Sequence, residues 1–481
     1  MDDRVTRLRR AHRYDEAIEL IEETLDGAVA EVELGRIALQ RRRHAVADDH
    51  LQRAVALDPT NELARAWQVA LLSSRRRYAE ARKLADVILA ELPDAHLTRI
   101  ARGRVSVDET GDNSSLLSEV EDVLDRDPNH LEALEWRISA LKHLARYAES
   151  DEAAREARRR YPYAPELACA RGSALAAAGR SDEALRCFEL ALNLQSDYIY
   201  AHEKKTSHLC KMGRYDEALS YIENVIEQHR DVGLLYSTWG MALHGIENHA
   251  DALDKFEHSV TLDPLDEGSH AMRVAILQLL GRTDQVVKAI EEGLGQLPDS
   301  IGLLIQKAAS LWIKDDPTTA LDLLEEASTK DPHDPHLTVF RISLLRFRGR
   351  FDDAEEVART GIKNRSRDAD LVNELGWIYA DQDRDEEALA LFVQAANLAP
   401  DSTEFAADES RALRWLHRHT EAHRALDEAI ERLPQRAELL EQKALTHEAT
   451  GADDEALVRW PRTFTGLVTR RARSWTAACV D

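Results

Sequence analysis

The sequence contains few cysteines, glycines and prolines. Its 481 residues include four cysteines, none of them in a Cys-x-x-Cys pair, so it predicts neither a disulfide framework nor a zinc ribbon. Glycine and proline number only 20 and 13, and the apolar content is ordinary, which disfavours disorder. A folded chain without covalent cross-links is expected.

Long apolar runs and a leader-like start are also missing. No stretch approaches the length needed to span a bilayer, and Met1-Asp2-Asp3-Arg4 does not begin a signal peptide. A cytoplasmic protein without a transmembrane segment is therefore expected. The net charge of −25 is spread along the chain, which disfavours a nucleic-acid partner because phosphate binding needs a basic field.

Motifs for chemistry are not found. The phosphate-binding, dinucleotide-binding, zinc-protease and nucleophile-elbow patterns do not occur. His417, His419 and His423 form a small cluster, for which a solvated turn is favoured over a metal site. The sequence predicts no cofactor, no metal and no enzymatic activity.

What the chain does contain is a small residue that returns every 34 residues. This repeat position, with one 35-residue step before Leu116, is occupied by Ala47, Ala81, Leu116, Ser150, Ala184, Ala218, Ala252, Val286, Ala320, Ala354, Ala388, Ala422 and Ala456. Nine of the thirteen prolines lie twelve residues after it. Self-similarity at this period predicts a solenoid of helix pairs, each packed on its neighbours.

Each repeat is predicted to hold two amphipathic helices, because apolar residues recur at spacings of three and four. Gly35, Gly172, Gly240 and Gly376 lie twelve residues before a repeat position and are expected to let the paired helices approach. In the turns "GRSDEA" (179–184) and "GRYDEA" (213–218), glycine should end one helix and Ser or Asp should cap the next. The longer turn "DETGDNSS" (108–115) is expected to be looser.

The period, the small residues and the phase of the prolines resemble the tetratricopeptide repeat family over roughly residues 28 to 458. Leu116, Ser150 and Val286 depart from the alanine that the family favours. The resemblance implies an all-α fold, an α-solenoid of stacked antiparallel helix pairs in a right-handed superhelix. The first helix of each pair would line the inner face, and the second helix the outer face.

The domain organisation expected from this pattern has four parts. Residues 1–27 form an irregular capping repeat, 28–436 the solenoid of about twelve repeats, 437–458 a last partial repeat, and 459–481 a divergent basic tail. Pro461 would interrupt a second helix there. Two interpretations stay open after Leu457: a cap or partner-docking tail, or a reading-frame change. An uncapped end would also permit a homo-oligomer through the chain ends.

The candidate binding groove uses inner positions of the first helices. It is predicted to be acidic in the N-terminal half and aromatic-basic in the C-terminal half, where Trp and Arg are typical of binding hot spots. The candidate residues are Glu135, Glu203, Ile305, Trp312, Val339, Arg346, Asn373, Trp377, Arg411 and Arg414. Such a groove would orient an extended peptide or a helix. The Lys and Asn pair of the family's carboxylate clamp is missing: Glu203 and Ser207, or Asn373 and Trp377, stand in its place.

The function predicted from these observations is a non-catalytic scaffold or adaptor that binds a protein or peptide in the concave groove. One alternative is a repeat subunit of an envelope-associated or self-assembling complex. Arg41-Arg42-Arg43 and Arg75-Arg76-Arg77 lie 34 residues apart and could face an anionic surface, although cations also favour helix C-termini. An alternative of another class is the regulatory part of an enzyme system.

Overall fold

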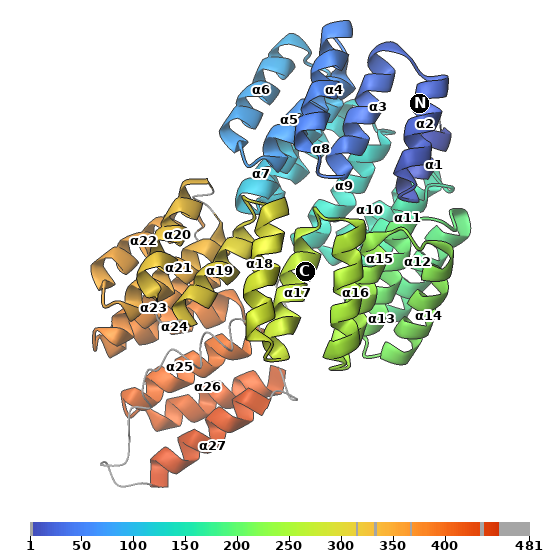
Figure 1. Ribbon diagram of the computed structural model, residues 1–481. Coiled ribbons are helices and arrows are strands. Elements are labelled where there is room, and N and C mark those ends of the chain that lie inside the picture. Colours follow the sequence, from blue (N-terminus) through green and yellow to red (C-terminus); the bar gives the residue numbers. More distant parts are fainter. Residues whose placement is uncertain (1–2, 314–315, 331–333, 366–367, 433–436, 452–481) are drawn as a thin grey trace. The chain divides into compact units, whose positions relative to one another are not determined.

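The computed structural model describes residues 3–313, 316–330, 334–365, 368–432 and 437–451, and their regular structure is entirely α-helical. Close contacts group the chain into Met1–Leu297, called unit 1 here, and Pro298–Asp481, called unit 2. The sequence pattern runs through this division, so each unit is described by itself (Figure 1). The predicted all-α solenoid of helix pairs is confirmed.

Unit 1 contains eighteen helices in its described part. They are α1 (Asp3–Arg10), α2 (Tyr14–Thr24), α3 (Gly27–Gln40), α4 (His44–Leu57), α5 (Glu62–Ser74), α6 (Tyr78–Glu91), α7 (His96–Thr110), α8 (Asn113–Arg126), α9 (Leu131–His143), α10 (Tyr147–Arg160), α11 (Pro165–Ala177), α12 (Ser181–Leu194), α13 (Ile199–Lys211), α14 (Tyr215–Gln228), α15 (Gly233–Gly245), α16 (His249–Leu262), α17 (Glu267–Leu279) and α18 (Thr283–Gln296).

Unit 2 continues the same alternation. Its described helices are α19 (Ile301–Ile313), α20 (Pro317–Lys330), α21 (Pro335–Phe347), α22 (Phe351–Asn364), α23 (Ala369–Asp381), α24 (Asp385–Leu398), α25 (Thr403–Trp415), α26 (His419–Arg432) and α27 (Ala437–Gly451). In both units the odd-numbered helices are the first helices of the repeats and the even-numbered ones the second helices. The predicted basic tail, 459–481, lies outside the described residues, as do 452–458.

The repeat position is buried in the second helices that the structure describes. Ala47, Ala184 and Ala388 are fully buried. Where Ser150 replaces alanine, its hydroxyl donates a hydrogen bond to the carbonyl oxygen of Ile138 on the paired helix at 2.8 Å. A small polar side chain fits here because this carbonyl is within its reach.

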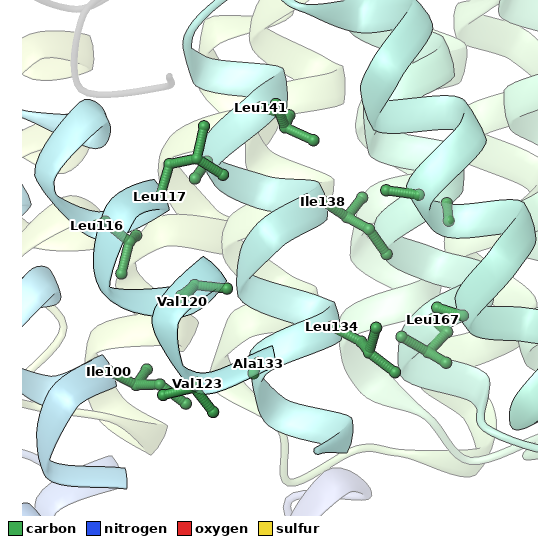
Figure 2. Close-up of a cluster of buried hydrophobic side chains, with 14 of the residues drawn as sticks. Ile100, Leu116, Leu117, Val120, Val123, Ala133, Leu134, Ile138, Leu141 and Leu167 are labelled. Atoms are coloured by element: carbon green, nitrogen blue, oxygen red, sulfur yellow. The ribbon is translucent and has the colours of Figure 1, made fainter. Parts of the chain in front are cut away.

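The predicted glycines do allow close approach of the paired helices. A Cβ atom at Gly172 would lie 2.6 Å from Phe188, and one at Gly376 would lie 2.7 Å from Phe392. Each phenylalanine comes from the second helix and fills the space that glycine leaves. Burial then continues from repeat to repeat: in Figure 2, residues of α7, α8, α9 and α11, among them Leu116 and Ile138, form one cluster.

The turns within repeats differ from the prediction. Gly179 and Gly213 do adopt left-handed backbone, with φ of 74°, but the predicted caps are wrong, because Arg180 and Arg214 occupy the N-cap and make no side-chain cap hydrogen bond. Each guanidinium instead pairs with an acid three residues on, Arg180 with Glu183 at 2.6 Å. The negative charge of this acid interacts favourably with the N-terminal end of the helix dipole. The arginine neutralises the charge of the acid.

The long turn at 108–115 closes more tightly than expected. Helix α7 runs on to Thr110, Gly111 is left-handed at φ 73°, and the Asp112 carboxylate accepts hydrogen bonds from the backbone N–H groups of Ser114 and Ser115. The additional residue therefore lengthens a capped helix instead of opening a loop. Within the described ranges, every helix is too short or too polar to cross a membrane.

Candidate functional site

All ten candidate residues lie on first helices. They are distributed as Glu135 on α9, Glu203 on α13, Ile305 and Trp312 on α19, Val339 and Arg346 on α21, Asn373 and Trp377 on α23, and Arg411 and Arg414 on α25. Their surroundings differ sharply between the two units.

In unit 1, Glu135 is a partly buried carboxyl among other acids. Burial, together with the neighbouring carboxylates of Glu166 and Glu132, raises the pKa of Glu135 to about 7. Arg10 of α1 opposes this shift and forms an ion pair with Glu166 at 2.7 Å. Three carboxyl groups therefore lie close together here, and one arginine of the same chain already contacts them.

Glu203 lies in a more mixed environment on α13. Its carboxylate accepts a hydrogen bond from the Ser207 hydroxyl at 3.0 Å and lies 3.3 Å from the Lys204 ammonium. The same ammonium lies 4.8 Å from the centre of the Tyr200 ring, and that ring is 43% exposed. An exposed aromatic ring flanked by paired charges can contact an apolar or a cationic group.

In unit 2, Arg346 is buried between acids of the next repeat. Its guanidinium lies 3.0 Å from Glu374 and 2.7 Å from Asp381, both on α23. Glu374 also accepts a hydrogen bond from the hydroxyl of Ser343 at 3.3 Å. Arg346 is thus bound within the solenoid, and its positive charge is neutralised there.

Trp377 is buried in the same way. Its indole N–H donates to Asp408 at 2.9 Å, and the side-chain amide of Asn373 donates to the same carboxylate oxygen at 3.0 Å. Asp408 also forms an ion pair with Arg411. The guanidinium groups of Arg346 and Arg411 lie 5.5 and 5.4 Å from the Trp377 ring centre, so two cations contact the ring.

Arg414 extends this arrangement to α27. It donates to the side-chain carbonyl of Gln442 at 2.8 Å and to the Thr446 hydroxyl at 3.1 Å. Burial and the nearby charge of Arg411 lower the pKa of Arg414 to about 10. These bonded groups lie on successive first helices, and we call them together the inner network: Ser343, Arg346, Asn373, Glu374, Trp377, Asp381, Asp408, Arg411, Arg414, Gln442 and Thr446.

An exposed apolar patch lies on α19 and α21, and of its residues the sequence analysis predicted only Trp312 as a binding residue. Ile305 and Val339 are buried, whereas Ile313 is 68% and Phe347 is 51% exposed. The Trp312 ring lies 5.1 Å from the Phe347 ring and 6.0 Å from that of Phe340. Trp312, Ile313, Phe340 and Phe347 together are called the apolar patch. The signal was present, since Ile313 and Phe347 occur 34 residues apart.

The arginine edge considered for an anionic surface is engaged in part within the chain. Arg41 forms an ion pair with Asp15 at 2.9 Å, and Arg75 with Asp48 at 2.7 Å. Each pair joins one repeat to the preceding repeat. These arginines therefore connect repeats, which reduces the positive charge that they offer to another surface.

The histidine cluster is spread over the α25–α27 region. The rings of His417 and His419 are 6.0 Å apart, and those of His423 and His447 are 4.2 Å apart. In the part of the chain that the structure describes, no three His, Cys, Asp or Glu side chains are placed to hold a metal ion.

Stacked antiparallel helix pairs define the class of α-solenoids. A tetratricopeptide repeat model matches residues 3–62 and 341–403, and a second such model matches 201–236. The chain is a tetratricopeptide repeat protein. Members of this family are in general non-catalytic adaptors.

Individual relatives are similar over part of the chain or at low identity. The Hsp70-Hsp90 organizing protein of Triticum aestivum is 33% identical over 102 residues, which is 21% of this chain and 18% of that protein. Yeast Tom70 matches with a TM-score of 0.49 and 15% identity, covering 93% of this chain and 99% of that one. Human IFIT1 matches with a TM-score of 0.43 and 16% identity, covering 83% and 96%.

Proposed function

We propose that the protein is a non-catalytic scaffold that binds an extended or helical segment of a partner protein on its first helices. The observation that carries this proposal is the apolar patch of unit 2. Ile313 and Phe347 are exposed at equivalent positions of successive first helices, where packing within the solenoid does not require apolar side chains. Grouped exposed apolar residues favour a protein contact.

The predicted groove residues divide into two roles in this proposal. Glu135, Glu203, Trp312 and Arg411 are partly exposed and can contact a partner directly. The buried members, among them Ile305, Val339, Arg346, Asn373, Trp377 and Arg414, hold the first helices at their spacing. The buried set therefore shapes the surface, and the exposed set recognises the partner.

The nature of the partner follows from the surface chemistry. Apolar and acidic groups on a chain of net charge −25 suit a protein segment better than a nucleic acid. The similar wheat protein is named as an organiser of Hsp70 and Hsp90, but the Lys and Asn pair of the carboxylate clamp is missing here, so we do not assign those partners. The unpaired thiols of Cys169, Cys187 and Cys210 fit a reducing, cytoplasmic location.

A peptide-display selection against the full chain tests the proposal. The selected peptides would be titrated by calorimetry into the wild type, into Ile313→Ala with Phe347→Ala, and into the control Val87→Ala. Val87 is also exposed, at 44%, but it lies on the second helix α6. We expect the double variant to lose about tenfold or more in affinity, as for truncated hot-spot residues, and the control to match the wild type.

Two results would overturn the assignment. Peptides that bind the double variant as tightly as the wild type would remove the apolar patch from the contact. No selected peptide at all, with light scattering that shows the patch variant to be monomeric and the wild type oligomeric, would replace the scaffold with self-assembly.

A further inference from the structure

One contact of unit 1 joins residues that are far apart in the sequence. The ion pairs between repeats described above connect residues about 26 to 35 positions apart, whereas Arg10 and Glu166 are separated by 156 positions. Through this pair the end of α1 lies against the start of α11 (Figure 1). In a solenoid, where each repeat packs on its neighbours, such a contact requires a specific reason.

The surroundings of Arg10 are those of a bound guanidinium. Glu166 accepts its hydrogen bond at 2.7 Å, and the side-chain carbonyl of Gln195 lies 3.5 Å from the same group. The ring of Tyr198 lies beside it, with its centre 6.0 Å away. The side-chain amide of Gln195 also donates to the carbonyl of Arg7 at 3.3 Å. A carboxylate, an amide and an aromatic ring are the groups that recognise arginine.

The acids at this place outnumber what Arg10 satisfies. Glu166 has a side chain only 9% exposed, and its second carboxylate oxygen, although buried, has no hydrogen-bond partner. Glu135 lies beside both Glu166 and Glu132, so three acids share this place with two cations, Arg10 and Arg104. A buried carboxylate oxygen without a donor costs free energy, so these groups can accept a further donor or a better-placed one.

Helix α1 is attached to its own repeat by other residues. Val5 is fully buried in the cluster formed with Ala17 and Ile21, and Arg9 lies 3.5 Å from the buried carboxylate of Glu33. Arg10, in contrast, is 26% exposed on its side chain and reaches across to α11. Its contact can therefore be exchanged while α1 stays folded on α2 and α3.

We propose that Glu166, Glu135, Gln195 and Tyr198 form a guanidinium-binding site, with Arg10 as its internal occupant and an arginine-bearing segment of the partner protein as its competing ligand. This inference rests on the proposed scaffold function and specifies the partner chemistry for unit 1. Helix α1 then regulates access: while Arg10 is seated the site is filled, and a partner arginine that takes its place also releases the link between α1 and α11.

Hydrogen exchange of the full chain tests the seating of Arg10 without any ligand. Arg10→Ala should increase exchange at the start of α11 and at the end of α1. The matched control is Arg13→Ala, because Arg13 forms a local pair with Glu16. Wild-type exchange at α11 in Arg10→Ala would show that the contact does not form in solution. The charge swap of Arg10→Glu with Glu166→Arg should restore protection.

Binding of a labelled peptide with six arginines in a Gly/Ser background tests the site itself. Arg10→Ala should raise the affinity about three- to tenfold, since it removes a part-buried competing ion pair. Glu166→Gln and Glu135→Gln, each combined with Arg10→Ala, should lower it again. The control Glu183→Gln changes an exposed acid of a second helix, and it should leave the affinity unchanged.

The two readouts separate the possible failures. If Arg10→Ala increases exchange but leaves the peptide affinity unchanged, the contact between Arg10 and Glu166 only holds the helices together. That result would overturn the guanidinium site. Equal losses in Glu166→Gln and Glu183→Gln would reduce the binding to general attraction by an acidic chain, which also overturns it. Failure of the apolar-patch experiment would overturn the scaffold proposal while leaving the exchange result in place.

Discussion

Two groups of charged residues on first helices, one in each unit, have different surroundings, although they share one repeat geometry. In unit 2, Arg346 lies between Glu374 and Asp381, so the charges are neutralised by neighbours. In unit 1, Glu135 lies beside Glu166, and Arg104 of α7 and Arg10 of α1 are the cations near Glu135; only Arg10 is paired with Glu166. The comparison teaches that a repeat scaffold can use the same positions either to join helices or to keep a charge available for another group.

The difference follows from which residues meet across adjacent repeats. First-helix contacts in unit 2 join residues 28 to 35 positions apart, and these offsets pair Arg with Glu or Asp, and Asn with Asp. In unit 1, the residue 31 positions after Glu135 is Glu166, another acid. Two acids on facing helices repel each other, which raises the pKa of the buried carboxyl and weakens the packing of the helices. This favours a binding role for Glu135 and Glu166 over a structural one.

The largest expected effect is the loss of the buried acid of unit 2. Glu374→Ala removes the fully buried partner of Arg346 and leaves only the part-buried carboxylate of Asp381 beside it. Removing one member of a buried pair typically costs about 3–5 kcal/mol. Urea unfolding followed by hydrogen exchange at α21 and α23 should show this loss in unit 2, with unit 1 unchanged.

A double change and an exposed pair serve as controls for that prediction. Arg346→Met with Glu374→Leu should recover part of the loss, because the two fully buried charges are removed together and only the part-buried Asp381 loses its contact with Arg346. Glu387→Gln disrupts the exposed pair with Arg384 and should change little. If Glu374→Ala unfolds like the wild type, the inner network does not stabilise unit 2, and the contrast between the units fails.

Replacing the acid of unit 1 is expected to stabilise the protein, whereas replacing the acid of unit 2 destabilises it. The pKa of Glu135 is raised from 4.5 to about 7. A raised carboxyl pKa gives stability that is complete below about pH 4.5 and is lost as the pH rises through 7. Glu135→Gln removes this loss, so at pH 8 the variant should be more stable than the wild type by about 1–3 kcal/mol. Partial exposure of the carboxyl favours the lower end.

Unfolding midpoints measured from pH 4 to pH 8 check this prediction. The two proteins should converge toward pH 4, where the carboxyl is protonated in the folded and the unfolded chain. Glu183→Gln should not show the effect, because the Arg180 hydrogen bond lowers the pKa of Glu183. A constant difference across this pH range would mean that Glu135 is not titrating near neutrality, and unit 1 would resemble unit 2.

The sequence predicted the helix pairs because packing at Gly172, Ala184 and their equivalents imposes a period that survives in the residues. It also placed all ten candidate residues on first helices, since position within the repeat decides that. It did not reveal that Arg346 and Trp377 are buried, because their burial depends on acids one repeat away. Arg346 precedes Glu374 by 28 residues, and Trp377 precedes Asp408 by 31 residues. Acids at these offsets are the sequence signal from which the burial of Arg346 and Trp377 could have been predicted.

The contact between Arg10 and Glu166 could not be predicted from the repeat. Neighbouring repeats are related by a fixed offset, but residues 156 positions apart meet only through the accumulated rotation of many repeats. A small error in each step shifts the final position by many ångströms. Local sequence therefore indicates the repeat contacts, whereas the long-range contact needs the three-dimensional path of unit 1.

The smallest predicted effect concerns a feature that both units contain, a left-handed residue shortly before second helices such as α12 and α22. Gly179 in unit 1 and Gly349 in unit 2 have φ of 74° and 69°, and an added Cβ would meet no atom within 4 Å at either. Gly179→Ala and Gly349→Ala should therefore each cost about 1 kcal/mol, from backbone strain alone.

Ala145, at φ 57°, already carries that strain, so Ala145→Gly should stabilise unit 1 by a similar amount. Exchange at the flanking helices measures all three; a gain in either Gly→Ala variant would show that the turn is not left-handed there. Equal losses in the two units would confine their difference to the first helices, where the charges differ and the turns do not.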